Sequence, residues 1–380
     1  MKECKYFTRC GGCRSIGKEY GATLEEKNRW IKGLLGGFCR VEPIIGADNP
    51  YFYRNKINAN FGRLKSGAVI AGTYEKNSHR IVDVEKCFLD DERGDEIVRC
   101  VVRLMKSFKY EPYNEDTRRG LIRHVLVRTA HSTGEVMVTI VTGTHIMPSK
   151  NNFVKALRKE CPYITTIIMN VNDKRTSMIL SDREEVLFGK GYIVDTLCGC
   201  SFKISSKSFY QVNSPQTEVL YNKAMEFAGL SGKERILDAY SGIGTIGIVA
   251  ASKGAGEVIG VELNPDAVRD AVNNVRYNHC VNAKYIQGDA TEFMDGESGS
   301  ERRYDVVFMD PPRSGSTERF ISSVAKLAPE KVVYISCNPE TLKRDVAFFV
   351  KKGYRMTKCQ PVDMFPWTNG AEVVALITRV

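Results

Sequence analysis

The sequence contains no long hydrophobic run and few cysteines for its length. No apolar stretch in its 380 residues approaches the ~18 residues that a membrane-spanning helix needs. The first residues, Met-Lys-Glu-Cys-Lys-Tyr, lack the apolar segment of a secretory signal. The 12 cysteines are about 3% of the chain, whereas a small disulfide scaffold has roughly 8 to 10%. We therefore expect a cytoplasmic protein without membrane association, whose cysteines serve metal binding or catalysis.

Internal repeats and low-complexity tracts are also missing from the sequence. Hydrophobic residues make up 43% of the chain and charged residues 26%, which is typical of a globular protein and excludes a disordered or fibrous one. At roughly 150 residues per domain, the length corresponds to two or three domains that can each bury a core. Nothing in the composition indicates an obligate protein partner.

Positive charge is concentrated in the first half of the chain. The formal charge is +10, and residues 1–200 carry 33 basic against 24 acidic side chains. Within this half, residues 101–159 carry 11 basic against 4 acidic side chains. The arginines of this stretch include Arg118, Arg119, Arg123 and Arg128. A basic surface binds a phosphate backbone through counterion release, although a merely solvated surface has the same composition.

The two halves of the chain differ in their expected secondary structure. In the first half, β-branched segments bounded by Gly, Asn or Asp predict strands at 136–141, 165–171 and 176–180, and one helix interrupts them early, at about 23–35. From Glu234 onward, strands alternate with amphipathic helices, which implies a parallel sheet covered on both faces. The expected strands are 235–239, 258–261, 283–287, 304–309 and 331–336. Ligands of such sheets bind beyond the carboxyl ends of the strands.

A glycine-rich motif follows the first of these strands. The segment Asp238-Ala-Tyr-Ser-Gly242-Ile-Gly244-Thr-Ile-Gly247 matches G-x-G-x-x-G, and Glu262 stands twenty residues after Gly242. This pattern is typical of dinucleotide-binding proteins. Glycines in such a turn also simply let a strand and a helix approach each other closely.

Four successive strands end in carboxylates, which argues against a pyrophosphate ligand. The acids are Asp238, Glu262, Asp289 and Asp310. A pyrophosphate in this place would meet like charges in a partly desolvated cleft, which costs several kcal/mol. S-adenosylmethionine has no phosphate; it carries an ammonium and a sulfonium, and its ribose hydroxyls and adenine amine can donate to carboxylates. We therefore predict an S-adenosylmethionine site at this edge of the sheet.

A cysteine follows the fifth strand, at the same edge. Cys337 precedes Asn338, a good N-cap, and Pro339, which suits the first helical position. The partial positive charge of a helix N-terminus stabilises a thiolate. A cysteine at a strand end is more often a small buried hydrophobe, but beside a methyl donor a nucleophile is favoured.

Methylation of carbon 5 of uracil requires such a thiolate. Addition of the thiolate to carbon 6 forms an enolate, whose carbon 5 can then attack the sulfonium methyl group. A base must then remove the proton from carbon 5 so that the cysteine is eliminated. Asp363 and Glu372, ahead of the last strand, are the candidate bases, and either could instead be a capping or turn acid.

Together these motifs resemble the S-adenosylmethionine-dependent RNA uracil-5-methyltransferases over essentially the whole chain. The motifs are Ser208-Phe-Tyr-Gln211-Val-Asn213, Asp238-Ala-Tyr240-Ser-Gly-Ile-Gly, Gly260-Val-Glu262, Asp310-Pro-Pro-Arg313, Ser336-Cys337-Asn338-Pro339 and Asp363-Met-Phe-Pro. The resemblance implies an α/β, Rossmann-like methyltransferase domain at 206–380. It also implies a preceding β-rich RNA-binding domain at 1–205 with an N-terminal iron–sulfur cysteine cluster. A helical segment at about 20–40 could pack on the catalytic domain.

The resemblance also implies the roles of individual residues. Cys337 is the nucleophile, and Glu372 is the base that takes the proton from carbon 5. The implied cofactor contacts are Gln211, Tyr240, Glu262 and Asp310, to which the position at a strand end adds Asp289. Thr245, which stands where the family commonly has asparagine, could still hydrogen-bond the cofactor. Trp367 and Gly370 stand where the family commonly has histidines, but the spacing to Glu372 is preserved.

Four cysteines of the first domain form a candidate metal site. Cys4, Cys10 and Cys13 lie within ten residues of one another, and Cys87 follows far downstream. Four sulfur ligands suit both zinc and iron–sulfur clusters, but structural zinc sites more often pair two short knuckles in which two to four residues separate the cysteines. Three ligands from one loop resemble the 4Fe-4S cluster of the ribosomal-RNA members of the family. With four cysteine ligands the cluster has no open site, so we expect a structural role.

Two basic segments of the first domain, Tyr53-Arg54-Asn55-Lys56 and 121–128, are similar to segments that the family places near RNA. We expect Arg123 and Arg128 to contact RNA, so that replacing both with alanine weakens RNA binding and leaves cofactor binding intact. His124, which alternation places on the face opposite Arg123, is expected to be structural.

Two further expectations concern how RNA is held. Phe365 and Trp367, next to the presumed site, are suited either to stacking on a flipped base or to the core. An additional oligonucleotide-binding barrel, found at the start of some family members, is not expected because Cys4 lies too close to the first residue. RNA would then be held by the basic first domain and the catalytic crevice.

The sequence thus predicts methylation of carbon 5 of a specific uridine in 23S ribosomal RNA, with S-adenosylmethionine and a 4Fe-4S cluster as cofactors. The cluster favours ribosomal RNA, because bacterial enzymes for the tRNA T-loop commonly lack it. A tRNA uracil-5-methyltransferase is one alternative. A noncatalytic RNA-binding protein of the same fold is the other, against which Cys337, Asp310 and Glu372 argue.

Overall fold

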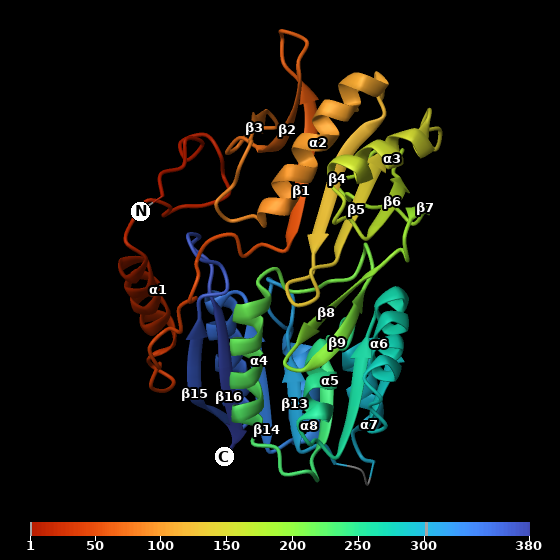
Figure 1. Ribbon diagram of the computed structural model, residues 1–380. Helices are drawn as coiled ribbons and strands as arrows, with labels where there is room; N and C mark the ends of the chain where they lie inside the picture. The colour runs from red at the N-terminus through yellow and green to blue at the C-terminus, as the bar shows by residue number, and fades with distance from the viewer. Residues whose placement is uncertain (1, 301–302) are drawn as a thin grey trace. The chain divides into compact units, whose positions relative to one another are not determined.

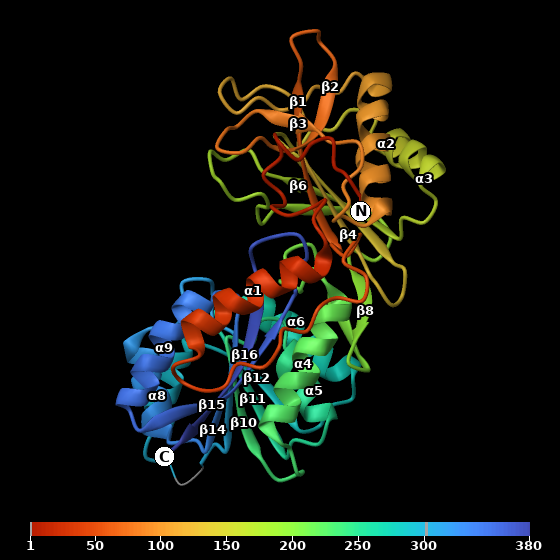
Figure 2. The same cartoon turned by 90° about the vertical axis from the view of Figure 1, so that its left-hand side faces the viewer.

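The computed structural model describes residues 2–300 and 303–380, which form two compact units (Figures 1 and 2). Unit 1 comprises Met1–Lys18, Asn49–Asp195 and Ile204–Lys207. Unit 2 comprises Glu19–Asp48, Thr196–Lys203 and Ser208–Val380. The chain therefore passes between the units several times, and an early segment folds with the C-terminal part of the sequence.

Unit 1 is built on one mixed sheet with the strand order β3-β2-β1-β4-β5-β6-β7. The strands are β1 Lys56–Arg63, β2 Val69–Tyr74, β3 Ile81–Asp83, β4 Ile122–Thr129, β5 Val136–Thr142, β6 Thr166–Val171 and β7 Glu184–Phe188. Neighbouring strands are antiparallel except β5 and β6, which are parallel. Two helices, α2 Glu92–Phe108 and α3 Lys150–Glu160, lie on the same side of this sheet and share its apolar core (Figure 2).

The secondary structure of unit 1 departs from the sequence prediction in two respects. The prediction had one helix in the first half, at about 23–35, and missed both α2 and α3. In α2, the buried Ile97, Val101 and Leu104 recur at helical spacing, so the signal for a helix was present. The strand predicted at 176–180 does not form, because the side-chain amide of Asn172 donates to the carbonyl oxygens of Met178 and Ile179, at 2.7 and 3.0 Å. A side chain that bonds these carbonyls holds the segment as a loop.

Unit 2 is built on a second sheet, with the strand order β12-β11-β10-β13-β14-β16-β15. The strands are β10 Arg235–Ala239, β11 Glu257–Glu262, β12 Ala283–Gln287, β13 Val306–Met309, β14 Lys331–Ser336, β15 Tyr354–Val362 and β16 Glu372–Arg379. The predicted parallel arrangement is confirmed for β10 to β14, whereas β16 pairs antiparallel with both β14 and β15. The predicted Rossmann-like α/β architecture is therefore confirmed for this part of the chain.

Helices cover both faces of the sheet of unit 2 (Figure 2). One layer contains α4 Ser214–Ala228, α5 Thr245–Ser252 and α6 Pro265–Tyr277; the other contains α1 Tyr20–Leu35, α7 Ala290–Glu297, α8 Glu318–Leu327 and α9 Pro339–Lys351. Ile31 and Leu35 of α1 are fully buried in the same apolar cluster as Phe349 of α9. The early helix is thus part of the core of unit 2.

A hairpin of β8 Ile193–Leu197 and β9 Cys200–Ile204 stands outside both sheets. Its two-residue turn, Cys198-Gly199, has positive φ angles of 52° and 81°, which match the twist of the flanking strands. None of the helices within residues 2–300 and 303–380 combines the length and apolar character that crossing a bilayer requires.

Candidate active site

The carboxyl ends of adjacent strands in unit 2 bring the predicted acids and the predicted nucleophile into one row. Taken in the spatial order β12, β11, β10, β13 and β14, the strands end within two residues of Asp289, Glu262, Asp238, Asp310 and Cys337. Strands β10 and β13 are neighbours in space but not in sequence, so the strand order reverses between Asp238 and Asp310. Open α/β sheets bind ligands at such a switch point.

The glycine-rich turn after β10 is held by two of these acids. The Asp238 carboxylate accepts from the Gly247 backbone N–H at 2.9 Å, and the Glu262 carboxylate accepts from the Gly242 N–H at 3.0 Å. A Cβ atom at Gly247 would lie 2.5 Å from the Tyr285 hydroxyl, so glycine there permits the close approach of α5 and β12. Asp238 is buried under the turn, whereas Glu262 is partly exposed to a ligand.

Tyr240 and Thr245 flank this turn. Tyr240 has a positive φ of 63°, and its ring stacks on Phe320 with the centroids 4.9 Å apart. The hydroxyl of Thr245 lies 2.9 Å from that of Tyr221. Both residues are partly exposed, which leaves them able to contact a ligand beside the turn.

Asp289 and Gln211 lie in different surroundings. Asp289 is exposed and caps α7, because its carboxylate accepts from the backbone N–H groups of Thr291 and Glu292 at 2.8 and 3.0 Å. These two amides hold the pKa of Asp289 below its ordinary value. Gln211 is buried just before α4. Asp289 therefore has a structural role as the N-cap of α7.

Cys337, Asp310 and Glu372 form one electrostatic cluster. In the antiparallel pair β14–β16, Ser336 lies opposite Val373. Cys337 follows Ser336 and Glu372 precedes Val373, so these two residues come together at this end of the strand pair. Burial, reinforced by the Glu372 and Asp310 carboxylates, raises the pKa of Cys337 to about 11. Burial also raises the pKa of Asp310 to about 7.

Glu372 is the more deeply buried of the two carboxylates. Its side chain is 2% exposed, and its Oε2 atom has no hydrogen-bond partner within the described part of the chain. Burial and the charge of Asp310 raise its pKa well above the ordinary value, while the nearby Arg313 opposes the shift. A buried carboxylate with an unsatisfied oxygen favours the protonated form or a ligand that it can bond.

Cys337 precedes a helix N-terminus, as predicted, but the net shift of its pKa is upward. Asn338 does cap α9, accepting from the Glu340 N–H at 3.1 Å, and Pro339 is the first residue of the helix, as predicted. Desolvation and two neighbouring carboxylates raise the pKa, and Arg313 opposes this shift. A thiolate at Cys337 therefore requires added positive charge.

Asp345 of α9 links the segment after β13 to β14, and it was missed in the sequence. Its carboxylate accepts from the Ser316 backbone N–H and from the Tyr334 hydroxyl, both at 2.7 Å. In addition, the Asn338 side chain donates to the Arg313 carbonyl at 3.2 Å. These bonds tie the segment after Asp310 to the segment that carries Cys337. An aspartate within the otherwise apolar stripe of a helix was the available signal.

The two candidate bases lie in different surroundings. The fully buried Asp363 carboxylate accepts from the Lys27 ammonium at 2.6 Å and from the Tyr20 hydroxyl at 2.8 Å. Both of its oxygens therefore already accept a hydrogen bond, whereas the Oε2 atom of Glu372 has no hydrogen-bond partner within the described residues. Trp367 is buried, and its ring lies 5.2 Å from that of Tyr20, so it is a core residue and not a stacking surface for a base.

The four cysteines of the predicted cluster all lie in unit 1 as free thiols. Burial and the neighbouring Cys4 and Cys10 raise the pKa of Cys13 to about 11. Burial also raises the pKa of Cys87, and Arg54 opposes the shift at both Cys13 and Cys87. Within residues 2–300 and 303–380, no three His, Cys, Asp or Glu side chains are arranged to hold a metal ion.

The arginines that were expected to contact RNA are buried in unit 1. The Arg123 side chain is 2% exposed; it donates to the Glu115 carboxylate at 2.8 Å and to the Asn172 carbonyl at 2.5 Å. Arg128 is also buried and donates to the Ser206 carbonyl at 3.4 Å. The expectation that these two side chains face RNA is therefore wrong, because both faces of β4 are covered.

Other parts of the basic segments have mixed exposure. Tyr53 and Asn55 are buried, whereas Arg118 and Arg119 are exposed. The Nδ1 atom of His124 lies 3.0 Å from the Asn60 side-chain oxygen, and burial lowers the pKa of His124 to about 4. The histidine is thus structural, as expected.

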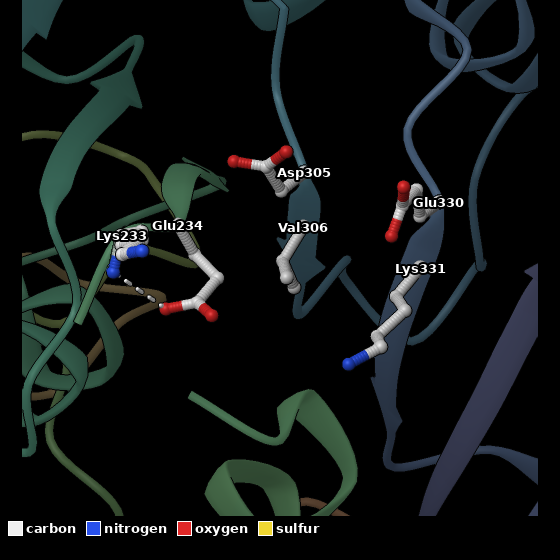
Figure 3. Close-up of a pocket in the computed structure, with 6 residues that line it drawn as sticks. All are labelled: Lys233, Glu234, Asp305, Val306, Glu330 and Lys331. Atoms are coloured by element: carbon white, nitrogen blue, oxygen red, sulfur yellow. Dashed lines mark hydrogen bonds between the residues drawn. The ribbon is translucent and has the colours of Figure 1, made fainter. Parts of the chain in front are cut away.

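A separate pocket of about 220 Å³ lies at the opposite edge of the sheet of unit 2 (Figure 3). Its lining residues are Lys233, Glu234, Asp305, Val306, Glu330 and Lys331. They lie at or just before the first residues of β10, β13 and β14. The Lys331 ammonium donates to the Ala228 carbonyl at 2.6 Å. This pocket is therefore distinct from the row of acids at the carboxyl ends.

Comparisons with known proteins agree on one family. The family model described as tRNA (uracil-5-)-methyltransferase matches residues 19–380. An uncharacterized RNA methyltransferase of Halalkalibacterium halodurans is 40% identical over 379 residues, covering 98% of this chain and 82% of that protein. Another from Clostridium acetobutylicum is 39% identical over 384 residues, covering 99% of this chain and 83% of that protein.

A solved structure is similar over nearly the whole length. The Pyrococcus abyssi tRNA (uracil-54, C5)-methyltransferase in complex with S-adenosyl-L-homocysteine matches with a TM-score of 0.82 and 30% identity. The match covers 97% of this chain and 86% of that one.

Proposed function

The chain belongs to the tRNA (uracil-5-)-methyltransferase family, and from this premise we propose that it methylates carbon 5 of a specific uridine in 23S ribosomal RNA. It is an S-adenosylmethionine-dependent RNA methyltransferase; the target RNA and the roles of individual residues are the proposed part. The observation that supports the mechanism best is the register of β14 and β16, which brings Cys337 and Glu372 together.

The acids of the site suit a cationic methyl donor. Through like charge, Asp310 raises the pKa of Glu372, and both carboxylates raise the pKa of Cys337. A bound ammonium and sulfonium would offset this repulsion and favour the ionised groups. We assign the contacts with S-adenosylmethionine to side chains around the glycine-rich turn and the switch point. They are Gln211, Tyr240, Thr245, Glu262, Asp289 and Asp310.

Each step of the reaction has a candidate residue. The Cys337 thiolate adds to carbon 6 of the uracil, and the electron pair of the double bond moves so that carbon 5 takes the methyl group from the sulfonium. Glu372 then removes the proton from carbon 5. The electron pair of that C–H bond restores the double bond as the C6–S bond breaks and the thiolate leaves. The products are 5-methyluridine and S-adenosylhomocysteine.

The pKa shifts of the free protein fit these roles once the substrates are considered. Cys337, with a pKa of about 11, is protonated near neutral pH, and Arg313 is the protein cation that favours its ionisation. The donor's positive charge would act in the same direction. The raised pKa of Glu372 makes its carboxylate a stronger base than an exposed glutamate.

Trapping on RNA that contains 5-fluorouridine tests this mechanism. Fluorine at carbon 5 cannot be removed as a proton, so the enzyme should stay attached to the methylated base. We expect wild-type protein with S-adenosylmethionine to form an adduct that survives denaturing electrophoresis, and Cys337→Ala to form none. The matched control is Cys280→Ala, at a partly buried cysteine just before β12, which should behave as wild type. An adduct with Cys337→Ala would refute the nucleophile assignment, and failure of the wild type would favour a noncatalytic RNA-binding protein.

The choice of ribosomal RNA over tRNA rests on the cysteine pattern. The alternative, a tRNA uracil-5-methyltransferase, is supported by the description of the family model and by the activity named for the Pyrococcus abyssi protein. Methyl transfer to 23S ribosomal RNA and tRNA transcripts separates the two. We expect incorporation into 23S ribosomal RNA; incorporation into tRNA alone would establish the alternative.

We further propose that Cys4, Cys10, Cys13 and Cys87 hold a 4Fe-4S cluster, although within the described residues their side chains are not already arranged around a metal ion. The thiols of the first three influence one another electrostatically, and Arg54 acts on both Cys13 and Cys87. An arginine beside these thiols can balance part of the negative charge of a thiolate-bound cluster. Protein purified without oxygen should be brown and contain iron and acid-labile sulfide. Colourless protein with stoichiometric zinc would show that the site is a zinc site.

A further inference from the structure

Lys27 of α1 is a buried cation that no part of the proposed mechanism uses. Its side chain is 6% exposed. The ammonium donates to the Asp363 carboxylate at 2.6 Å, to the Phe365 carbonyl at 3.0 Å and to the Gly370 carbonyl at 2.8 Å. These three bonds use all the donors of a lysine ammonium.

All three acceptors belong to the β15–β16 loop, residues 363–371, which lies between Val362 and Glu372. Asp363 and Phe365 lie at the start of the loop, and Gly370 lies two residues before Glu372. One ammonium therefore fixes the distance between the two ends of the loop. Glu372 is the first residue of β16 and lies opposite Val362 of β15, so the position of its side chain depends on this pair and on the loop that joins the two strands.

Further contacts hold the first half of the loop, and within the loop the Thr368 hydroxyl donates to the Phe365 carbonyl and accepts from the Gly370 N–H. The Tyr20 hydroxyl of α1 donates to the second oxygen of Asp363 at 2.8 Å. From the N-terminal turn of α4, Asn213 donates to the Met364 carbonyl at 3.0 Å and Gln216 donates to the Asp363 carbonyl at 3.1 Å. Among these side chains of α1 and of the N-terminal turn of α4, Lys27 alone also bonds Gly370, on the side of Glu372.

A buried ion pair is weak evidence for stability, because desolvation of both charges offsets their attraction. Burial lowers the pKa of Lys27, and the Asp363 carboxylate opposes this shift. We therefore interpret the pair by its effect on the conformation of the β15–β16 loop. A general base must lie within hydrogen-bond reach of the proton it removes, and a displacement of about 1 Å can cost roughly 100-fold in rate.

We propose that Lys27 is a positioning residue for Glu372, holding the β15–β16 loop so that the carboxylate meets the proton on carbon 5. The inference rests on the proposed function, since it requires Glu372 to act as the base. It assigns to the early helix α1 a part in one chemical step: the removal of the carbon 5 proton, with elimination of Cys337 from carbon 6.

The test is a single-turnover experiment with Lys27→Met, which keeps most of the side-chain volume and removes the donors. The RNA is a transcript that the wild-type protein methylates, and both the denaturation-resistant adduct and 5-methyluridine are followed over time. We expect the adduct to form at close to the wild-type rate and to break down about 10- to 100-fold more slowly. Deuterium at carbon 5 of the target uridine should slow the breakdown further, because proton removal then limits the rate.

Two further variants complete the design. Lys32→Met replaces an exposed lysine of the same helix and should leave both rates unchanged. Tyr20→Phe removes one bond to Asp363 without leaving a buried charge, and should slow breakdown less than Lys27→Met does. This milder variant keeps the proposal testable if Lys27→Met does not fold, as judged by melting temperature and S-adenosylhomocysteine binding.

The outcomes separate the inference from the proposed function. If formation and breakdown of the adduct slow equally in the folded variants, or if breakdown is unchanged, Lys27 does not position the base. If the wild-type protein forms no adduct with any RNA, the proposed mechanism fails and not only the role of Lys27.

Discussion

At the scale of single residues, the site places a carboxylate where water cannot stabilise its charge. Glu372 is almost completely buried beside Asp310, and its Oε2 atom lacks a partner within the described residues. The folded state is favoured when such a buried carboxyl group is protonated. At neutral pH, ionisation of this buried carboxylate therefore lowers the stability of the free protein, while its raised pKa makes the carboxylate a stronger base.

This arrangement makes the stability of the free protein dependent on pH. A carboxylate whose pKa is higher in the folded than in the unfolded state stabilises the fold below the unfolded pKa, about 4.3 for glutamate, and loses that contribution as the pH rises through the folded value. Glu372 is shifted in this direction, as are Asp310, to about 7, and Asp238, to about 8. We expect wild-type protein to lose stability between about pH 5 and pH 9.

Replacement of Glu372 with glutamine should remove part of this pH dependence. Urea denaturation of Glu372→Gln should give a higher free energy of unfolding than wild type at pH 9, on the order of 1–2 kcal/mol, and a smaller difference at pH 5. Glu330→Gln, at an exposed position on the opposite edge of the sheet, is the matched control and should follow the wild type. Parallel curves for wild type and Glu372→Gln would show that Glu372 does not titrate in this range.

At the scale of elements, strand β4 shows why basic residues in a strand need not form a binding surface. A strand with one covered face shows alternating burial, but β4 is buried at nearly every position. Helix α2 packs on the strand in Figure 1, and Arg123 bonds carbonyl oxygens of the segment after β6. Arginine is therefore used here to satisfy backbone acceptors. The exposed basic residues nearest in sequence are Arg118 and Arg119, in the turn before β4.

Two sets of variants distinguish a structural from an RNA-binding arginine. Arg123→Ala should lower the free energy of unfolding by about 2–4 kcal/mol, because it leaves buried carbonyls without donors. The double variant Arg118→Asn and Arg119→Ala should change stability by less than about 0.5 kcal/mol, asparagine being chosen because Arg118 has a φ of 56°. It should weaken RNA binding and reduce its dependence on salt. An unchanged salt dependence would exclude these two residues from the RNA contact.

At the scale of the whole molecule, the chain forms two units with separate apolar cores. One core is shared by the sheet of unit 1 with α2 and α3, and the other by the sheet of unit 2 with α1, α8 and α9. All proposed contacts with the methyl donor lie in unit 2, and all four cysteines of the proposed cluster lie in unit 1. Ligands that bind only the folded form stabilise the unit that binds them.

Hydrogen exchange should therefore respond to S-adenosylhomocysteine in one unit only. We expect slower exchange in the backbone amides of β10, β11 and β13 and of the glycine-rich turn, with little change in β1 to β7. Mass spectrometry of peptides, with and without S-adenosylhomocysteine, measures both units at once. Protection confined to unit 1, or its absence from β10 and β13, would contradict the placement of the donor site.

The sequence by itself determined the chemistry available to this protein. The alternation of strands and helices, the acids at strand ends and Cys337 before Asn338-Pro339 are local patterns, and the backbone geometry of strands and helix caps fixes their consequences. Tertiary structure decided which of these groups can act and how. The Asp363 carboxylate accepts a hydrogen bond from Lys27, 336 residues away in the sequence. Burial and nearby carboxylates raise the pKa of Cys337, and Arg123 and Arg128 are buried. Burial and local electric field depend on neighbours that are distant along the chain, and no local pattern contains that information.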